Sequence, residues 1–275
     1  MRRQAWFEIH DHPLFPGYLR NLFTDALEAI LNAQDFYGPV ALRLRHAVAK
    51  SRATRIVDLC SGGGGPWLRF SRDLPGNQGR ALEILLTDKY PNQRAFQQIQ
   101  AATGGAIGFN PEPVDAMRIP AELAGFRTMF STFHHFGPEE ARAILKDAFD
   151  QRQGIGIFEG AKCDPRTLAA MFVVPLLALR FTLRIRPFRW ARIFWTYCVP
   201  VIPFTLWLDG LLSCLRSYSQ ADMWELIEGL TAENYAWEIG EERRGFVSVR
   251  YLVGCPVGGA VAEVARVVNE KACLV

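Results

Sequence analysis

A run of glycines between an apolar strand and a helix constrains the fold of this chain more than any other feature. The segment is Ile56–Trp67, IVDLCSGGGGPW, in which a short apolar run ends at Asp58 and four consecutive glycines follow at positions 62–65. Glycines allow the backbone to approach a ligand closely, and the amides at the start of the next helix attract polar groups. The segment therefore predicts a tight, ligand-binding turn between a buried strand and a helix.

Further apolar segments repeat the strand pattern along the chain. They lie at 83–88, 107–114, 126–132 and 154–160, and helical patterns at 67–73, 91–101 and 138–151 separate them. Strands that alternate with helices predict a doubly wound α/β sheet with mostly parallel strands. Ligands of such sheets bind beyond the carboxyl ends of the strands, so the residues that follow each strand are the candidates for chemistry.

Composition narrows the class of protein. The chain has 275 residues, 49% hydrophobic and 21% charged, which suits one globular domain with a large insertion or two small domains. A net charge of +3 is too small to indicate a nucleic-acid partner. The six cysteines form no Cys-x-x-Cys pair, and no apolar run follows the arginines near the start. We therefore expect a cytoplasmic protein without a secretion signal.

Acidic residues follow the next two predicted strands. Asp88 ends the second strand, where it suits ribose hydroxyls, and Asp115-Ala116-Met117 follows the third, where it suits an adenine ring. A nicotinamide or flavin nucleotide would also use a glycine turn. However, the run is not Gly-x-Gly-x-x-Gly in its usual setting, and the chain contains no Tyr-x-x-x-Lys pair.

The order of these motifs resembles that of the class I (Rossmann-like) S-adenosylmethionine-dependent methyltransferases. The segments are VDLCSGGGGP, LLTDKYPN, PVDAMRIP, MFSTFHHF and GIFEG, followed by a terminal hairpin, and they cover about residues 55–160 and 235–254. The resemblance implies a seven-stranded, mostly parallel sheet. It also implies that S-adenosylmethionine is the cofactor and that S-adenosylhomocysteine is the product.

The resemblance also assigns the residues that hold the cofactor. Asp58 would face the amino group of the methionine part, and Asp88 the ribose. The other predicted cofactor residues are Cys60, Gly62, Gly64, Lys89, Asp115 and Ala116. Cys60 stands where the usual Asp-x-Gly-x-Gly-x-Gly pattern has its first glycine, so we expect the loop to pack differently there.

The methyl acceptor should lie after the fourth and fifth strands. Methyl transfer needs alignment, exclusion of water and, for a hydroxyl acceptor, removal of a proton. His134 and His135 are candidates for this general base, with Phe133 beside the acceptor; the alternative is that the histidines brace the loop. Glu159 is either a second base or a partner for backbone amides. The His10-Asp11-His12 segment suits a lid, and no ligand spacing predicts a metal site.

An apolar insertion follows the fifth strand. Residues 167–208 contain no acid and five arginines, and the uncharged runs Leu168–Leu179 and Ile193–Leu208 have twelve and sixteen residues. A membrane span needs about twenty residues, and prolines interrupt both runs. Two interpretations remain: a helical cap packed on the sheet over a substrate cavity, or peripheral membrane contact through 168–215. Asp209 and Arg216 would bind the polar end of the substrate, or would form a buried ion pair.

The sequence therefore predicts a methyltransferase for a hydrophobic small molecule, acting at oxygen or nitrogen. We divide the chain into a helical lid (1–50), the Rossmann-like core (51–163), the insertion (164–218) and the end of the core with its hairpin (219–275). The alternatives are a non-methylating use of the same cofactor, such as a cyclisation, and a membrane-associated lipid methyltransferase. A nucleic-acid substrate is disfavoured, because no Asn/Asp-Pro-Pro-Tyr/Phe motif follows the fourth strand.

Overall fold

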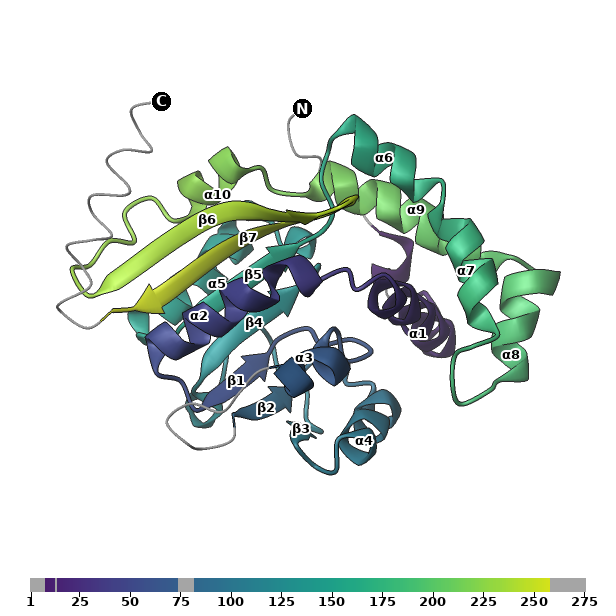
Figure 1. Ribbon diagram of the computed structural model, residues 1–275, viewed down its shortest axis with the longest axis horizontal. Coiled ribbons are helices and arrows are strands. Elements are labelled where there is room, and N and C mark those ends of the chain that lie inside the picture. Colours follow the sequence, from purple (N-terminus) through teal and green to yellow (C-terminus); the bar gives the residue numbers. More distant parts are fainter. Residues whose placement is uncertain (1–7, 13, 74–81, 258–275) are drawn as a thin grey trace.

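The computed structural model describes residues 8–12, 14–73 and 82–257, and these form a seven-stranded sheet flanked by helices (Figure 1). The strand order is β3-β2-β1-β4-β5-β7-β6. The strands are β1 (Arg55–Asp58), β2 (Glu83–Leu86), β3 (Ile107–Phe109), β4 (Phe126–Phe130), β5 (Ile155–Glu159), β6 (Tyr235–Arg244) and β7 (Val247–Pro256). The first five are parallel, and β7 runs antiparallel to both of its neighbours. The predicted α/β fold class is confirmed.

Helices cover both faces of the sheet. All five residues of β4 and of β5 are buried, as expected for parallel strands with helices on each side. One apolar cluster joins the sheet to α2 (Ala41–Ser51), α3 (Trp67–Asp73) and α4 (Gln93–Ala102). A second cluster on the opposite face joins it to α5 (Pro138–Asp150) and α10 (Gln220–Leu226). Short turns η2 (Gly38–Val40) and η3 (Ala121–Leu123) complete the core.

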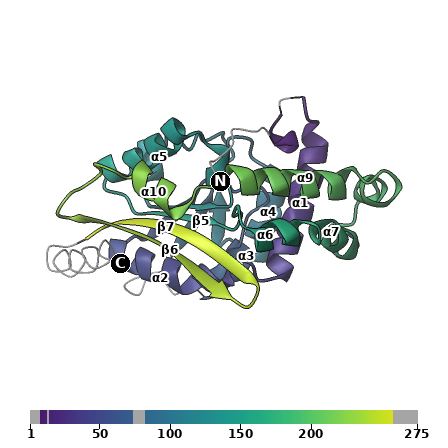
Figure 2. The same ribbon diagram turned by 90° about the horizontal axis from the view of Figure 1, so that it is seen from above.

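The N-terminal segment and the insertion pack together beyond one edge of this core (Figures 1 and 2). The N-terminal elements are η1 (Ile9–Asp11) and α1 (Gly17–Ala33). The insertion consists of α6 (Pro165–Met171), α7 (Val174–Thr182), α8 (Trp190–Ile193), the π-helical turn η5 (Phe194–Cys198) and α9 (Val201–Arg216). A third apolar cluster, which includes Leu22, Phe23 and Ile30 of α1 and Ile202 and Leu206 of α9, joins the two.

Two predictions about these regions are wrong in detail. The insertion is helical, as predicted, but the apolar cluster that holds α7 and α9 is formed with α1, not with the sheet. The turn-prone sequence Glu-Glu-Arg-Arg-Gly at 241–245 predicts hairpin strands at 236–239 and 246–253, whereas β6 continues through Arg244 and the turn is confined to Gly245 and Phe246. Cross-strand pairing therefore overrides the polar, turn-prone composition of Glu241–Arg244.

The insertion also contains apolar helices of considerable length. Among the described residues, the stretch Pro165–Thr182 is long and apolar enough to cross a membrane, and only 11% of it is buried. The elements Trp190–Cys198 and Val201–Arg216 pass the same test only as a pair, which is bent by 70°. Length and composition alone are weak evidence for a span, since core helices share both properties.

Candidate active site

The glycine loop lies at the carboxyl end of β1, where the strand order reverses between β1 and β4. Such reversals create the crevice in which open α/β sheets bind ligands. Cys60 adopts φ of 56°, and Gly62, Gly64 and Gly65 have φ of 55°, 111° and 56°. Cys60 thus takes the left-handed conformation that favours glycine, so the loop keeps its tight turn despite the substitution.

Helix α1 covers the loop with one of its faces. Thr24, Glu28 and Asn32 are spaced four residues apart and point to successive glycines. A Cβ at Gly63 would collide with the carboxylate of Glu28, and the amide of Asn32 donates to the carbonyl of Gly65 at 3.4 Å. Gly63 therefore leaves room for the Glu28 carboxylate, while Gly62, Gly64 and Gly65 supply the positive φ of the turn.

Asp58 is a buried carboxyl at the end of β1, with 2% of its surface exposed. Its oxygens accept hydrogen bonds from the hydroxyls of Thr128, at 2.6 Å, and Ser61, at 2.7 Å. Burial raises the pKa of Asp58 to about 7, although both hydrogen bonds lower it. A buried carboxyl of this kind is stabilised by a ligand cation.

Asp88 and Asp115 lie in the segments that follow β2 and β3, and Asp88 contacts the glycine loop. One oxygen of Asp88 accepts from the amide of Gly62 and the other from the amide of Tyr90, both at 2.8 Å. Asp115 accepts from the amide of Met117 at 3.0 Å and from Lys89 at 3.1 Å. These bonds hold the pKa of Asp115 below its ordinary value. Ala116 is buried in the cluster beneath β1.

Carboxyl groups dominate the surroundings of the glycine loop. Glu28 adds a third carboxyl group to those of Asp58 and Asp88. Burial raises the pKa of Glu28 well above its ordinary value, and the neighbouring Asp25 raises it further. A cation placed here would let Asp58 and Glu28 ionise, whereas a pyrophosphate would meet three carboxyl groups. The donor set therefore fits the ammonium and sulfonium of S-adenosylmethionine better than a dinucleotide.

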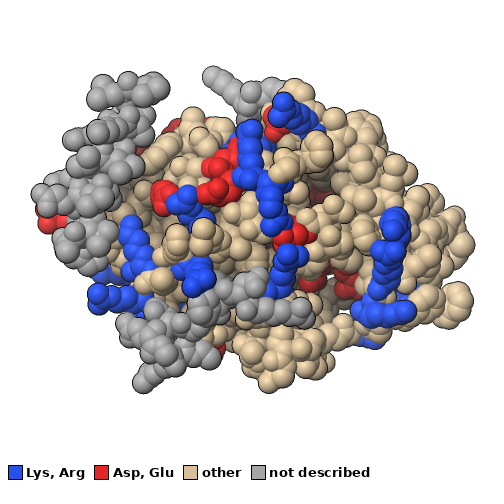
Figure 3. All heavy atoms as spheres, in the orientation of Figure 1, with Lys and Arg blue, Asp and Glu red and all other residues tan. Residues whose placement is uncertain are grey.

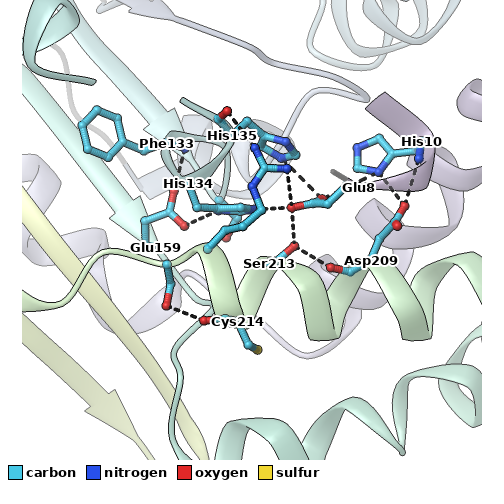
Figure 4. Close-up of polar contacts among 12 residues, drawn as sticks. Glu8, His10, Phe133, His134, His135, Glu159, Asp209, Ser213 and Cys214 are labelled. Carbon is cyan, nitrogen blue, oxygen red and sulfur yellow. Dashed lines mark hydrogen bonds and ion pairs between the residues drawn. The ribbon is translucent and has the colours of Figure 1, made fainter. Parts of the chain in front are cut away.

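A second polar cluster lies beyond β4 and β5 (Figure 4). Nδ1 of His134, on the turn η4 (Phe133–His135), lies 2.6 Å from Glu159, and its Nε2 lies 3.4 Å from Glu8. All three side chains are almost fully buried. Burial would lower the pKa of His134, but Glu159 and Glu8 raise it to about 10. His134 is therefore a positively charged imidazolium between two carboxylates.

Glu8 connects this cluster to the N-terminal segment and to α9. Burial would raise the pKa of Glu8, but the hydrogen bond of His134 and the nearby histidine charges lower it to about 2. Its oxygens lie 3.5 Å from Arg216 and 3.8 Å from His135. The hydroxyl of Ser213 donates to it at 3.1 Å. The sequence analysis missed Glu8, since a single acid in a short segment carries no motif.

The two residues predicted for the substrate on α9 do not form an ion pair with each other. Asp209 accepts from the amides of Ile9 and His10, at 2.7 and 3.1 Å, and lies 2.8 Å from the ring of His10. Arg216 instead donates to the carbonyl of His135 at 2.8 Å. Asp209 therefore fastens the N-terminal turn to α9, and the predicted alternative of a buried Asp209–Arg216 pair is wrong.

The remaining predicted residues differ in exposure. Both oxygens of Glu159 are engaged, since the amide of Phe133 donates to one of them at 2.7 Å. The ring of Phe133 is buried against Tyr218, so its backbone, not its ring, joins the polar cluster. His135 is the more accessible imidazole, with 21% of its side chain exposed. Ligand atoms of Glu8, His134 and His135 lie within 4.8 Å of one another, a spacing that could hold a metal ion.

Comparison with solved structures identifies the fold. An O-methyltransferase family protein from Burkholderia thailandensis matches with a TM-score of 0.50 and 17% identity, over 91% of this chain and 62% of that one. A putative O-methyltransferase from Nostoc punctiforme matches with a TM-score of 0.51 and 11% identity, over 88% of this chain and 61% of that one. The chain thus spans about three fifths of the length of these proteins. No protein-family model and no curated protein matches the sequence. The fold is that of the class I methyltransferases.

Proposed function

We propose that this protein is an S-adenosylmethionine-dependent methyltransferase that acts at oxygen or nitrogen of a hydrophobic small molecule. The observation that carries the proposal is the acidic glycine loop at the reversal point of the sheet, where the carboxyl groups of Asp58 and Glu28 are buried and burial raises the pKa of each. Two solved structures with this fold are described as an O-methyltransferase family protein and a putative O-methyltransferase, which supports the same reaction class.

Different residues of the loop and its surroundings would bind different parts of the cofactor. Asp58 would pair with the ammonium group of the methionine part, and Asp88, anchored by the Gly62 amide, would accept from the ribose hydroxyls. Asp115, Ala116 and Lys89 would contact the adenine; Lys89 donates to Asp115, and Ala116 is buried nearby in the second apolar cluster. Bound there, S-adenosylmethionine supplies an electrophilic methyl group. The protein has to align the acceptor and exclude water.

The histidine cluster would serve the acceptor. The pKa of His134 is raised to about 10, and carboxylates face both of its ring nitrogens, so it is unsuited to removing the acceptor's proton and would instead hold the turn η4 in place. Glu159 holds Nδ1 of His134 and is a positioning residue. We assign the general base to His135, which is the more exposed of the two imidazoles.

The domain assignment follows from these roles. Residues 1–50 would form a lid through α1, residues 51–163 and 219–275 the core, and residues 164–218 an insertion that holds the lid. A reducing cytoplasm suits the chain, since its six cysteines are scattered and form no Cys-x-x-Cys pair.

Calorimetry and turnover assays test the proposal together. We expect the wild type to bind S-adenosylmethionine and not NAD, and Asp88→Ala to weaken that binding about ten- to a hundredfold. With phenols and amines as acceptors, His135→Ala should lower turnover by about 10²–10⁴ at unchanged cofactor affinity. His46→Ala, on the exposed side of α2, is the matched control and should leave turnover unchanged. Binding of NAD instead, or cofactor turnover without a methylated product, would contradict the proposal.

A further inference from the structure

We propose that the insertion docks this protein on an anionic lipid surface, with α7 lying in the plane of the membrane interface. The contact surface, here called the outer face, is formed by exposed apolar side chains of the insertion. These are Phe172, Leu176, Leu179, Leu183, Tyr197 and Phe204, which are between 36% and 63% exposed. The proposal is independent of methyl transfer, because none of these residues contributes to the cofactor or histidine clusters.

Helix α7 is apolar on two opposite sides. Its inner side, with Val174, Ala178 and Phe181, packs on α1 in the third apolar cluster. The outward side chains at positions 172, 176, 179 and 183 recur every three or four residues and therefore form a second stripe. A helix that is apolar all round belongs either in the centre of a large protein or in lipid. Here one of its two sides has no protein cover among the described residues.

Neighbouring elements extend this stripe into a continuous surface. The hydroxyl of Tyr197 on η5 donates to the carbonyl of Leu179 at 2.5 Å, which joins η5 to the middle of α7. On the other side, the rings of Phe172 and Trp207 are 5.8 Å apart, and those of Trp207 and Phe204 are 6.0 Å apart. Single exposed apolar residues are ordinary, whereas a continuous patch marks an interaction site.

The charges around the outer face favour an anionic partner. No acidic residue occurs between Asp164 and Asp209, and Arg180, Arg184 and Arg186 are exposed along the end of α7 and the turn after it. In Figure 3 the end of the molecule that carries α7 and α8 shows uncharged atoms with arginine side chains between them. Arginines beside an apolar stripe are typical of helices that bind anionic headgroups.

The packing of α7 on α1 favours an interfacial position over a membrane span. The inner side of α7 cannot enter lipid without leaving α1, and α1 covers the glycine loop with its other face. Trp190, on α8 of the same insertion, is 79% exposed, and its ring lies 5.2 Å from that of Phe188, which is 45% exposed. Tryptophan at the edge of an apolar patch is characteristic of the headgroup region of a bilayer.

A second copy of this chain is a poorer partner for the outer face. Two copies meeting there would place exposed arginines near one another, and the intervening segment of 165–208 supplies no acid to neutralise them. Like charges at an interface are strongly unfavourable. An anionic lipid surface satisfies both the apolar stripe and the arginines.

Vesicle sedimentation tests the proposal. The wild type should bind phosphatidylcholine vesicles that contain about 30% phosphatidylglycerol, and binding should weaken without the anionic lipid or in high salt. Leu176→Gln should weaken binding about tenfold, whereas Leu42→Gln on α2 should not; the two leucines are 63% and 60% exposed. Arg184→Gln should weaken it about fivefold, and the exposed Arg45→Gln should have no effect.

A fluorescence measurement provides a second readout that does not depend on the leucine variants. Brominated lipid should quench the wild type more strongly than Trp190→Phe, because Trp190, on α8 of the docking insertion, is 79% exposed. The proposal is overturned if the wild type stays in the supernatant with anionic vesicles, or if Leu42→Gln weakens binding as much as Leu176→Gln. It is also overturned by a lipid-free dimer that Leu176→Gln dissociates, since a second copy would then cover the face.

Discussion

The pH dependence of cofactor binding tests the role of Asp58 directly. Burial raises the pKa of this carboxyl to about 7 in the free protein, above its ordinary value of 3.8. An ammonium group beside the carboxylate should return the pKa toward the ordinary value. Binding then requires the loss of a proton from Asp58 at any pH below about 7, and cofactor affinity should fall as the pH falls.

The size of the effect follows from the shift. Affinity should decrease about tenfold for each pH unit below 7, so about a hundredfold between pH 7 and pH 5. The cofactor ammonium stays charged throughout this window, because α-amino groups titrate at about 8. Glu28, whose pKa is also raised, can only steepen the dependence.

Calorimetric titration of the wild type and Asp58→Asn at several pH values measures this slope. Asp58→Asn should bind S-adenosylmethionine more weakly at pH 7. The slope of its affinity against pH should be smaller than that of the wild type by one proton. Asp150→Asn is the control, because that exposed carboxylate on α5 forms its one ion pair among the described residues with Lys146, away from the glycine loop. An equal slope in the wild type and Asp58→Asn, or an affinity that rises as the pH falls, would refute the role of Asp58.

Two further predictions concern stability. The raised pKa of His134 means that its pairing with Glu159 stabilises the fold fully below pH 6.5, and that this stability is lost as the pH rises through about 10. Glu159→Gln should therefore lower the free energy of unfolding in urea by about 3 kcal/mol at pH 6 and by less at pH 10. The control Lys146→Ala, which breaks an exposed ion pair, should change it by less than about 0.5 kcal/mol. An equal loss for Glu159→Gln at both pH values would contradict this prediction. Gly64→Ala should cost more stability than Gly105→Ala, because both have positive φ but only the Cβ at Gly64 would overlap a side chain of α4. Similar melting temperatures for the two variants would disprove that steric argument.

The core of the fold could be predicted because its signals are local. Each parallel strand is a short apolar run, and an acidic candidate residue such as Asp58, Asp88 or Glu159 lies at the end of the run or just after it. The strand order then brings the ends of β1 and β4 together, so the candidate residues of the loop and of the turn after β4 fall at one edge. Spacing along the chain is enough to find such residues.

The arrangement of the insertion and the N-terminal segment could not be predicted in this way. Glu8 and His134 are far apart in the sequence, and their contact depends on Asp209 fastening η1 to α9. Apolar composition indicated that the insertion needs a partner, but not that α1 is that partner. The outward stripe of α7 has the same spacing as its buried stripe, so periodicity cannot tell the two apart.

Helix α1 contacts the glycine loop on one side and the insertion on the other, and any opening of the molecule has to involve both contacts. Thr24, Glu28 and Asn32 lie on the glycine loop, while Leu22 and Ile30 lie in the apolar cluster with α7 and α9. If α1 moved away from the loop to admit a ligand, it would either carry the insertion with it or break that cluster. The lid and the insertion should therefore open as one cooperative unit, so that a lipid surface holding α7 would also set how often the crevice beneath α1 is uncovered.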